Sequence, residues 1–108
     1  MKKWILPLAL TIFLFSPTSH AYKSYGSGTT SCGTWTDNRS EERTSSPLAA
    51  KMGWVLGFLS GAGWMGLEQR DADVDGIMAW IDNYCQANPL DKVSDAATAL
   101  ANELAQTK

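Results

Sequence analysis

Histidine is almost missing from this chain. Its one histidine, His20, lies within residues 1–21, which we expect to be removed as a signal peptide. Without histidine a protein has no imidazole base for a serine or cysteine nucleophile and no imidazole ligand for a metal. Paired carboxylates can still do acid–base chemistry, but no pair stands out among the 11 Asp and Glu residues. We therefore expect a protein that is not an enzyme, with no catalytic residue and no cofactor.

An excess of basic residues is also missing. The chain has 9 Lys and Arg against 11 Asp and Glu. Lys2 and Lys3 belong to the expected signal, so the remainder carries 7 basic against 11 acidic residues, a net charge of −4. A nucleic-acid surface needs Lys and Arg to neutralise phosphates. An acidic mature chain therefore argues against nucleic acid as a partner.

No apolar run is long enough to span a bilayer, which takes about 20 residues. The longest is Trp4–Phe15, preceded by Lys2 and Lys3 and followed by the small residues Ser19 and Ala21. This order of charge, apolar segment and small residues is typical of a secretory signal peptide. We expect residues 1–21 to be a signal peptide, cleaved after Ala21. The mature protein is then periplasmic, with no stable membrane insertion.

Cysteine is scarce, with only Cys32 and Cys85 in the chain. In an exported protein both face an oxidising compartment and should pair. The bond would close a loop of 54 residues, which stabilises the fold by about 4 kcal/mol in the chain-entropy description. We predict a Cys32–Cys85 disulfide that supplies a large share of the stability of a small domain.

The chain after the signal divides into two parts. Residues 22–31 are rich in Gly, Ser and Thr and are expected to be a flexible leader, while residues 32–108 are expected to form a helical domain. The polar residues that follow Trp35 either begin a helix after Asp37 or Ser40, or stay irregular as far as Ser46.

A strongly apolar helix is predicted after Ser46-Pro47, where serine is a good N-cap and proline suits the first helical position. Its pattern covers Leu48 to Leu59, and the small residues 61–63 are expected to end it. Gly53, Gly57 and Gly61 recur every four residues, which lets another backbone approach closely. Such spacing occurs in membrane helix pairs, but Lys51 within the helix favours a tight bundle outside the membrane.

Two further helices follow from apolar residues at helical spacing. The first contains Val74, Ile77, Met78, Ile81, Tyr84 and Cys85, and the second Leu90, Val93, Ala97, Leu100 and Leu104. Asn88 and Asp91 are expected to cap the second of them. No alternating pattern of a strand is present. The predicted fold is all-α: a small three- to four-helix domain tied by one disulfide.

Asp71, Asp73 and Asp75, followed by Gly76, match the first half of a calcium-binding loop. Asp82 falls at the twelfth position, where a longer glutamate is usual, and no second loop accompanies it. Acidic residues are equally expected at the start of a helix, where they suit the helix dipole. We favour this second interpretation and predict no metal site, with calcium at these four aspartates as the alternative.

The run Trp64-Met65-Gly66-Leu67 is a second apolar cluster, placed in a predicted loop. Such residues more often pack back onto a small core, but an exposed patch of this kind is typical of a contact surface. Trp64 and Met65 are therefore the candidate partner-binding residues.

Several motifs together resemble a group of small exported bacterial proteins. They are Ser-Cys-Gly-Thr-Trp at 31–35, Trp-Val-Leu-Gly-Phe-Leu-Ser-Gly at 54–61, Asp-Gly at 75–76, and Trp-Ile-Asp-Asn-Tyr-Cys-Gln-Ala-Asn-Pro-Leu at 80–90. The chain from about Cys32 to Leu104 is similar to the HdeA-type acid-stress chaperones and to the Rap1a/Tai immunity proteins, which guard against secreted amidase toxins. The resemblance implies a signal peptide, a helical fold and disulfide-linked cysteines.

The chain departs from both groups. The immunity proteins often carry further cysteines, and the HdeA type has many lysines, whereas the mature chain here has two cysteines and four lysines. Only the cysteine pair carries over residue by residue.

Three hypotheses for function follow. The first is a partner-binding protein of the cell envelope, such as an immunity factor or an accessory protein of a secretion apparatus. The second is an acid-stress periplasmic chaperone, and the third a calcium-stabilised structural module. The sequence leaves a homo-oligomer open in each case.

Overall fold

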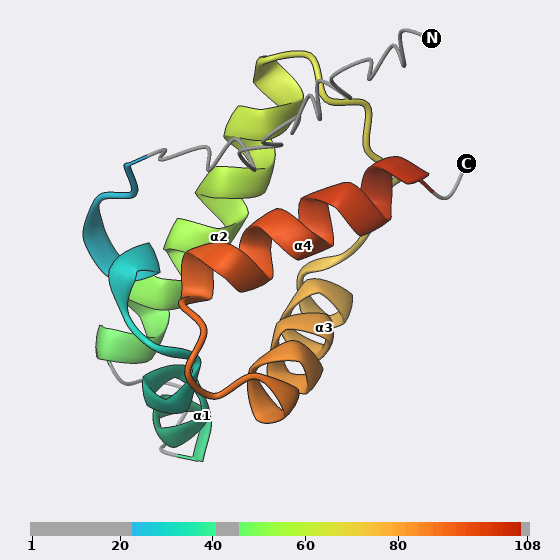
Figure 1. Ribbon diagram of the computed structural model, residues 1–108. Coiled ribbons are helices and arrows are strands. Elements are labelled where there is room, and N and C mark those ends of the chain that lie inside the picture. The colour runs from blue at the N-terminus through green and yellow to red at the C-terminus, as the bar shows by residue number, and fades with distance from the viewer. Residues whose placement is uncertain (1–22, 41–45, 107–108) are drawn as a thin grey trace, which may run out of the picture.

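A computed structural model describes residues 23–40 and 46–106 of the chain. These ranges form a short 3-10 helix, η1, and four α-helices, and they contain no strand beyond an isolated bridge between Ser31 and Lys92 (Figure 1). Helix α1 packs on α3, α3 on α4 and α2 on α4, while η1 lies against α2 and α4. The predicted all-α domain tied by one disulfide is confirmed. The bounds are η1 Gly26–Thr29, α1 Cys32–Ser40, α2 Ser46–Trp64, α3 Val74–Ala87 and α4 Val93–Gln106.

Helix α1 is an element that the sequence analysis did not place. It begins at Cys32, not after Asp37 or Ser40. Ser31 caps it, because its Oγ accepts a hydrogen bond from the backbone N–H of Thr34 at 3.1 Å. Cys32 and Trp35 are fully buried, so tertiary packing stabilises a segment whose Gly and Thr residues are poor helix formers.

Helix α2 begins at Ser46, as predicted, but continues through residues 61–63 to Trp64. The expected end at these residues is therefore wrong. The helix ends in a Schellman arrangement, in which Leu67 N–H donates to Ala62 O and Gly66 N–H donates to Gly63 O, both at 3.0 Å. Gly66, at φ +105°, supplies the left-handed backbone that this ending requires. Among the described residues, no helix combines the length and apolarity that crossing a membrane demands.

The glycine row on α2 does not meet another helix. A Cβ atom added at Gly53, Gly57 or Gly61 would have no other atom within 4 Å in the described part of the chain. The opposite side of the helix faces the core instead, through Leu48, Val55 and Leu59. The predicted close approach of a second backbone at the glycines is therefore wrong for the described residues.

The apolar stripes of α3 and α4 form most of the core, as predicted, with two exceptions. Leu90 is 94% exposed and lies in the turn before α4, while Val74, the first residue of α3, is 46% exposed. Helix α4 starts only at Val93. Its cap is the Asp95 carboxylate, which accepts a hydrogen bond from Lys92 N–H at 2.9 Å. The buried members are Ile77, Met78, Ile81, Cys85, Val93, Ala96, Ala97, Leu100, Ala101 and Leu104.

The described part of the expected leader, residues 23–31, makes specific contacts with the helices. Gly28 is buried beneath the indole ring of Trp54, and Trp54 Nε1–H donates to Tyr25 O at 2.7 Å. The same segment is also bonded to the start of α4, where Val93 N–H donates to Thr30 O at 2.9 Å. The Gly and Ser content of this segment gave no indication of these contacts.

Gly28→Ala is expected to lower the free energy of unfolding by about 2 kcal/mol, because the new methyl group would collide with the Trp54 ring. Gly57→Ala serves as the matched control. It adds the same methyl group to an open position inside α2 and should raise the free energy by about 0.5–1 kcal/mol. Urea unfolding followed by circular dichroism measures both. Equal changes in the two variants would contradict the packing of Gly28 on Trp54.

Candidate functional site

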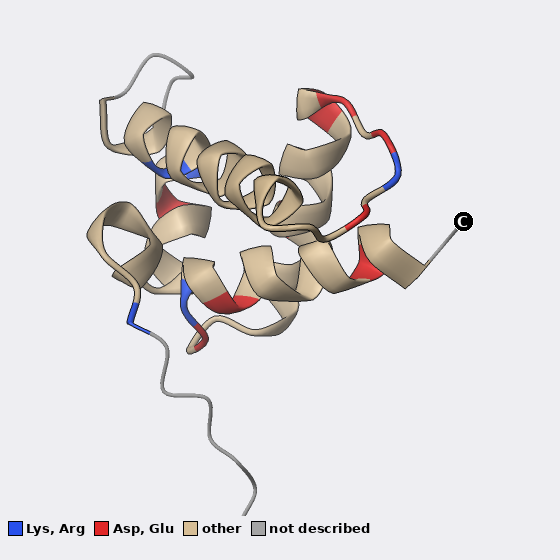
Figure 2. Ribbon diagram, turned by 90° about the horizontal axis from the view of Figure 1, so that it is seen from above, with Lys and Arg blue, Asp and Glu red and all other residues tan. Residues whose placement is uncertain are grey.

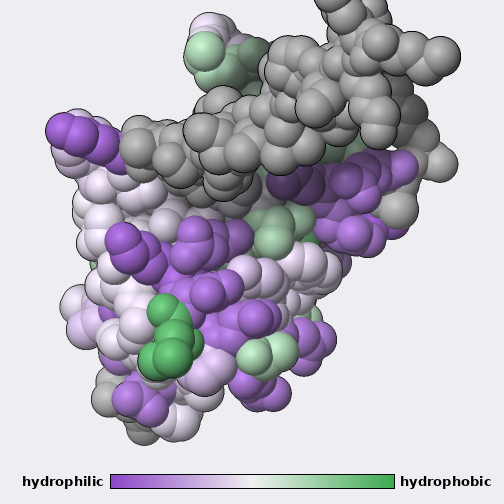
Figure 3. Space-filling view, viewed as in Figure 1, coloured by the Kyte–Doolittle hydropathy of each residue, from purple (hydrophilic) through white to green (hydrophobic). Residues whose placement is uncertain are grey.

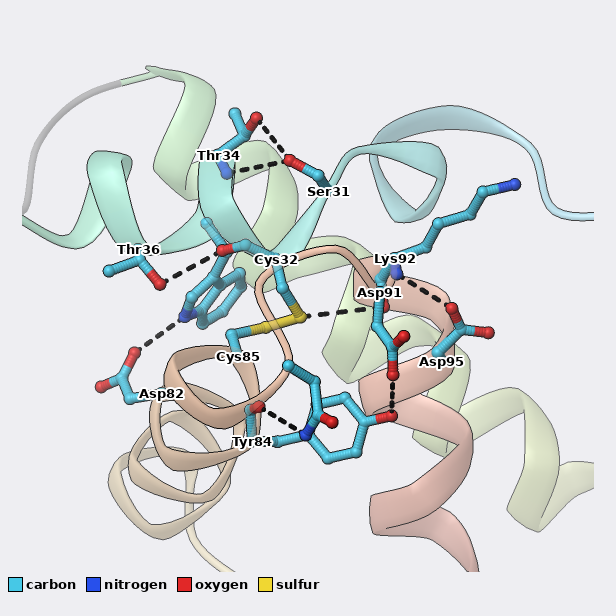
Figure 4. Close-up of a disulfide and its surroundings, with 12 residues drawn as sticks. Ser31, Cys32, Thr34, Thr36, Asp82, Tyr84, Cys85, Asp91, Lys92 and Asp95 are labelled. Atoms are coloured by element: carbon cyan, nitrogen blue, oxygen red, sulfur yellow. Dashed lines mark hydrogen bonds between the residues drawn. A yellow bond between two sulfur atoms is a disulfide. The ribbon is translucent and has the colours of Figure 1, made fainter.

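The disulfide joins the first and third α-helices at the centre of the domain. Cys32 at the start of α1 and Cys85 near the end of α3 are bonded to each other, and both are fully buried (Figure 4). Backbone hydrogen bonds accompany the covalent link: Cys32 N–H donates to Asp91 O at 2.7 Å, and Gly33 N–H to Pro89 O at 3.0 Å. The predicted cysteine pair is therefore present as a buried disulfide, and backbone hydrogen bonds lie beside it.

Asp82 is a polar junction between α1 and α3. Its Oδ1 accepts hydrogen bonds from Trp35 Nε1–H and Arg39 Nε–H, and its Oδ2 accepts one from an Arg39 Nη2–H, each at 2.8 Å. Figure 4 shows the Asp82 carboxylate turned towards α1, on the side of the disulfide away from Tyr84. The buried indole is thus satisfied, and the carboxylate is paired in the bidentate geometry that suits arginine.

The ion pair shifts the titration of Arg39. Its hydrogen bonds with Asp82 raise the pKa of the Arg39 guanidinium above its ordinary value. Because the folded pKa is the higher one, the stabilisation is fully present below the unfolded pKa and is lost only as the pH rises through the folded pKa. The positive charge on Arg39 is therefore constant over the whole range in which proteins normally work.

Substitution of Asp82 separates its two roles. Asp82→Ala leaves the Trp35 N–H and the Arg39 charge without an acceptor and should lower the free energy of unfolding by about 2–3 kcal/mol. Asp82→Asn keeps an acceptor for the indole but loses the charge, so the free energy of unfolding should fall by only about 1 kcal/mol. Both values follow from urea unfolding curves. A larger loss in the asparagine variant than in the alanine variant would contradict this division.

The structure does not bring the four calcium candidates together. Asp73 caps α3, its Oδ1 accepting a hydrogen bond from Gly76 N–H at 2.7 Å, while Asp82 is held by Trp35 and Arg39. Asp71 and Asp75 are exposed, and no group of three or more possible ligands converges within residues 23–40 and 46–106. Asp73 therefore acts as the N-cap of α3, and calcium at the four aspartates stays a hypothesis.

Trp64 and Met65 stand out from the surface at the end of α2. Their side chains are 90% and 84% exposed. They do not pack back onto the core, although such residues more often do so in a small protein. In the face shown in Figure 3, hydrophobic surface is limited to small areas among hydrophilic side chains, one of them at the top, where Figure 1 places the end of α2.

The exposed side of α2 continues from Trp64 down the helix as an uncharged surface. The only ionisable residue of α2, Lys51, is 6% exposed and faces the other way. The Ser60 hydroxyl is satisfied inside the helix, donating to Leu56 O at 2.7 Å. We call this surface the α2 outer face; it consists of the exposed residues Ala49, Ala50, Gly53, Gly57, Ser60, Gly61 and Trp64.

Acidic residues border one end of this face. The segment between α2 and α3 and the start of α3 carry four exposed carboxylates and one exposed guanidinium, and Figure 2 shows them as red and blue positions along one connection. A partner that covers Trp64 and Met65 would therefore meet negative charge beside an apolar centre. The five charged residues are Glu68, Arg70, Asp71, Asp73 and Asp75.

Comparison of the chain with protein-family models, with curated proteins and with solved structures gave no match.

Proposed function

We propose that this protein is exported to a bacterial periplasm, loses residues 1–21, and there binds one partner protein without catalysing a reaction. The disulfide supports the location, because such bonds form and persist in oxidising compartments. The resemblance to small exported bacterial proteins supports the same compartment and an immunity-like or secretion-accessory role.

Exposure of Trp64 and Met65 carries the proposal. A monomeric protein rarely leaves a tryptophan 90% exposed beside an equally exposed methionine. Both residue types are enriched in the cores of protein interfaces, where large side chains fill pockets on the partner. The α2 outer face extends this apolar centre without any charge that would have to lose its water.

The partner is expected to offer an apolar pocket with a basic rim. Glu68, Asp71 and Asp73 lie along the chain just beyond Met65 and are exposed. Positive side chains on the partner would complement them and speed the encounter, since complementary charge chiefly raises the association rate. High salt should accordingly slow association more than it speeds dissociation.

The experiment begins with the oxidised mature protein and an envelope extract at neutral pH. A single stoichiometric partner is expected, and its affinity is then measured with purified protein. The double substitution Trp64→Ala/Met65→Ala should weaken binding by at least about 30-fold, the size of an interface hot spot.

Leu90→Ala is the matched control, because Leu90 is 94% exposed but lies in the turn before α4. It should leave the affinity unchanged. Equal weakening by both substitutions would place the interface elsewhere. A mature protein that forms no one-to-one complex would contradict the partner-binding function itself.

An acid-stress chaperone is the second candidate. Carboxylates make several of the contacts that hold the helices: Asp82 bonds Trp35 and Arg39, and Asp91 Oδ2 accepts the Tyr84 hydroxyl at 2.6 Å. Loosening of these contacts in acid would expose partly buried rings such as Trp54 and Phe58. This function requires the protein to suppress aggregation of unrelated clients in acid and not at pH 7.

A further inference from the structure

We propose a binding site for a free apolar α-amino acid, of the size of leucine, in a hollow between the segment that precedes α3 and the helices α3 and α4. The hollow has a volume of about 240 Å³. In Figure 1 the segment that leads from α2 to α3 passes the C-terminal end of α4, where Arg70 N–H donates to Leu104 O at 3.0 Å. This bond fixes the outer wall of the hollow against α4.

The floor of the hollow is apolar and belongs to the core of the domain. It is lined by Ile77 of α3 and by Leu100 and Leu104 of α4, all three of them buried. Trp80 also lines the hollow and is half-buried, and its ring stacks on Tyr84 with the ring centroids 5.7 Å apart. An aliphatic side chain that enters the hollow would leave water for contact with these apolar residues, which favours binding.

The rim of the hollow carries one positive and one negative charge. Arg70 and Asp71 are the only charged residues in its lining, and both are exposed. Neither side chain makes an ion pair or a hydrogen bond with another residue in the described part of the chain. The guanidinium of Arg39, by contrast, is already occupied by Asp82. Both charges at the rim can therefore be used by a ligand.

The floor and the rim together define the class of ligand. An apolar cavity of about 150 Å³ can hold benzene, so the hollow has room for a leucine-sized side chain. Arg70 suits a carboxylate, which a guanidinium binds through two parallel hydrogen bonds, and Asp71 suits an ammonium group. A free α-amino acid carries both of these groups on one carbon atom, beside its side chain.

Other apolar ligands match the rim less well. A carboxylic acid without an amine would place its negative charge beside Asp71, and like charges that meet at a binding surface weaken association. A residue within a peptide chain has neither a free carboxylate nor a free ammonium group, so it would leave both rim charges without a partner. The pairing of Arg70 with Asp71 above an apolar floor therefore favours the free amino acid.

Titration of the oxidised mature protein with L-leucine, at constant ionic strength, tests the site. Amide NMR signals of Arg70, Asp71 and Leu104 should shift and saturate with a dissociation constant of about 1 mM, because so small a ligand gains little contact area. L-Leucinamide lacks the carboxylate and N-acetyl-L-leucine lacks the ammonium group, so each should bind about tenfold more weakly. Glycine has no side chain and should give no saturating shift below about 20 mM.

Substitutions at the rim test the two charges separately. Arg70→Gln should weaken L-leucine binding by about tenfold and Asp71→Asn by about fivefold. The urea unfolding curve should not change in either variant, because neither side chain has a partner among the described residues.

Lys92→Ala is the control for charge, since it also removes one exposed positive group but lies just before α4. It should leave L-leucine binding unchanged. Trp64→Ala/Met65→Ala should also leave it unchanged, because neither residue lines the hollow, so this site and the proposed partner surface can fail independently.

Two results would overturn the proposal. The first is a set of shifts that rise linearly with L-leucine concentration, or that are the same in the Arg70→Gln variant. The second is equal binding of N-acetyl-L-leucinamide, an uncharged mimic of a residue within a chain, which would identify the hollow as a pocket for a side chain of a partner protein.

Discussion

Replacing Cys32 and Cys85 together by alanine is expected to lower the free energy of unfolding by about 4 kcal/mol. The two residues are separated by 53 positions, and a crosslink over such a distance removes much of the conformational entropy of the unfolded chain. The free energy of unfolding of a small domain is about 5–15 kcal/mol in total, so the variant should be only marginally stable. Urea unfolding followed by far-ultraviolet circular dichroism measures the difference.

Reduction of the unaltered protein is the control for this prediction. It breaks the crosslink but keeps both sulfur atoms in the core, so any excess loss in the alanine variant reports the packing of the fully buried sulfurs. If reduction lowers the free energy of unfolding by less than about 1 kcal/mol, the loop-entropy account does not apply to this domain.

Trp35→Ala should destabilise the domain by a similar amount, about 4 kcal/mol. Trp35 is completely buried, and it is the largest completely buried side chain within residues 23–40 and 46–106. Truncation removes a large apolar contact area and leaves a cavity between α1 and α3. It also removes the hydrogen bond from Trp35 to Asp82, so that Asp82 keeps only its bonds with Arg39 from α1.

Trp35→Phe distinguishes the ring from its N–H. It fills most of the cavity but cannot donate to Asp82, so a loss of about 2 kcal/mol is expected from the two smaller effects together. Thermal and urea unfolding should rank the variants as wild type, phenylalanine and alanine. An alanine variant as stable as the phenylalanine variant would show that Trp35 packing contributes little.

Patterns of apolar residues were sufficient to predict the later helices, and the two cysteines of an expected exported chain predicted the disulfide. Ile77, Ile81 and Cys85 repeat at helical spacing and are buried where predicted. The errors occur where spacing alone cannot choose a boundary. Leu90 continues the α4 stripe in sequence, yet it is 94% exposed because the Asp95 cap starts the helix only at Val93. The small residues 61–63 look like a helix end, although the left-handed residue is Gly66.

Contacts between distant segments were beyond sequence reasoning. Nothing in residues 32–40 indicates a helix strongly, because α1 depends on burial of Cys32 and Trp35 against α3. The Asp82 junction combines residues from separate elements. Local patterns carry no information on which distant groups will meet. Trp64 and Met65 were candidates from sequence, but their exposure needed the structure.

The backbone bonds that join residues 30–33 to residues 89–93 also bear on how the chain folds. They link positions about sixty apart, as between Cys32 N–H and Asp91 O. Closing so long a loop early is slow, because its entropy is lost before the contacts form. A nascent chain that ends before residue 89 lacks the backbone partners of residues 30–33. The domain should therefore reach its native state only after nearly the whole chain has emerged, later than a bundle built from neighbouring helices.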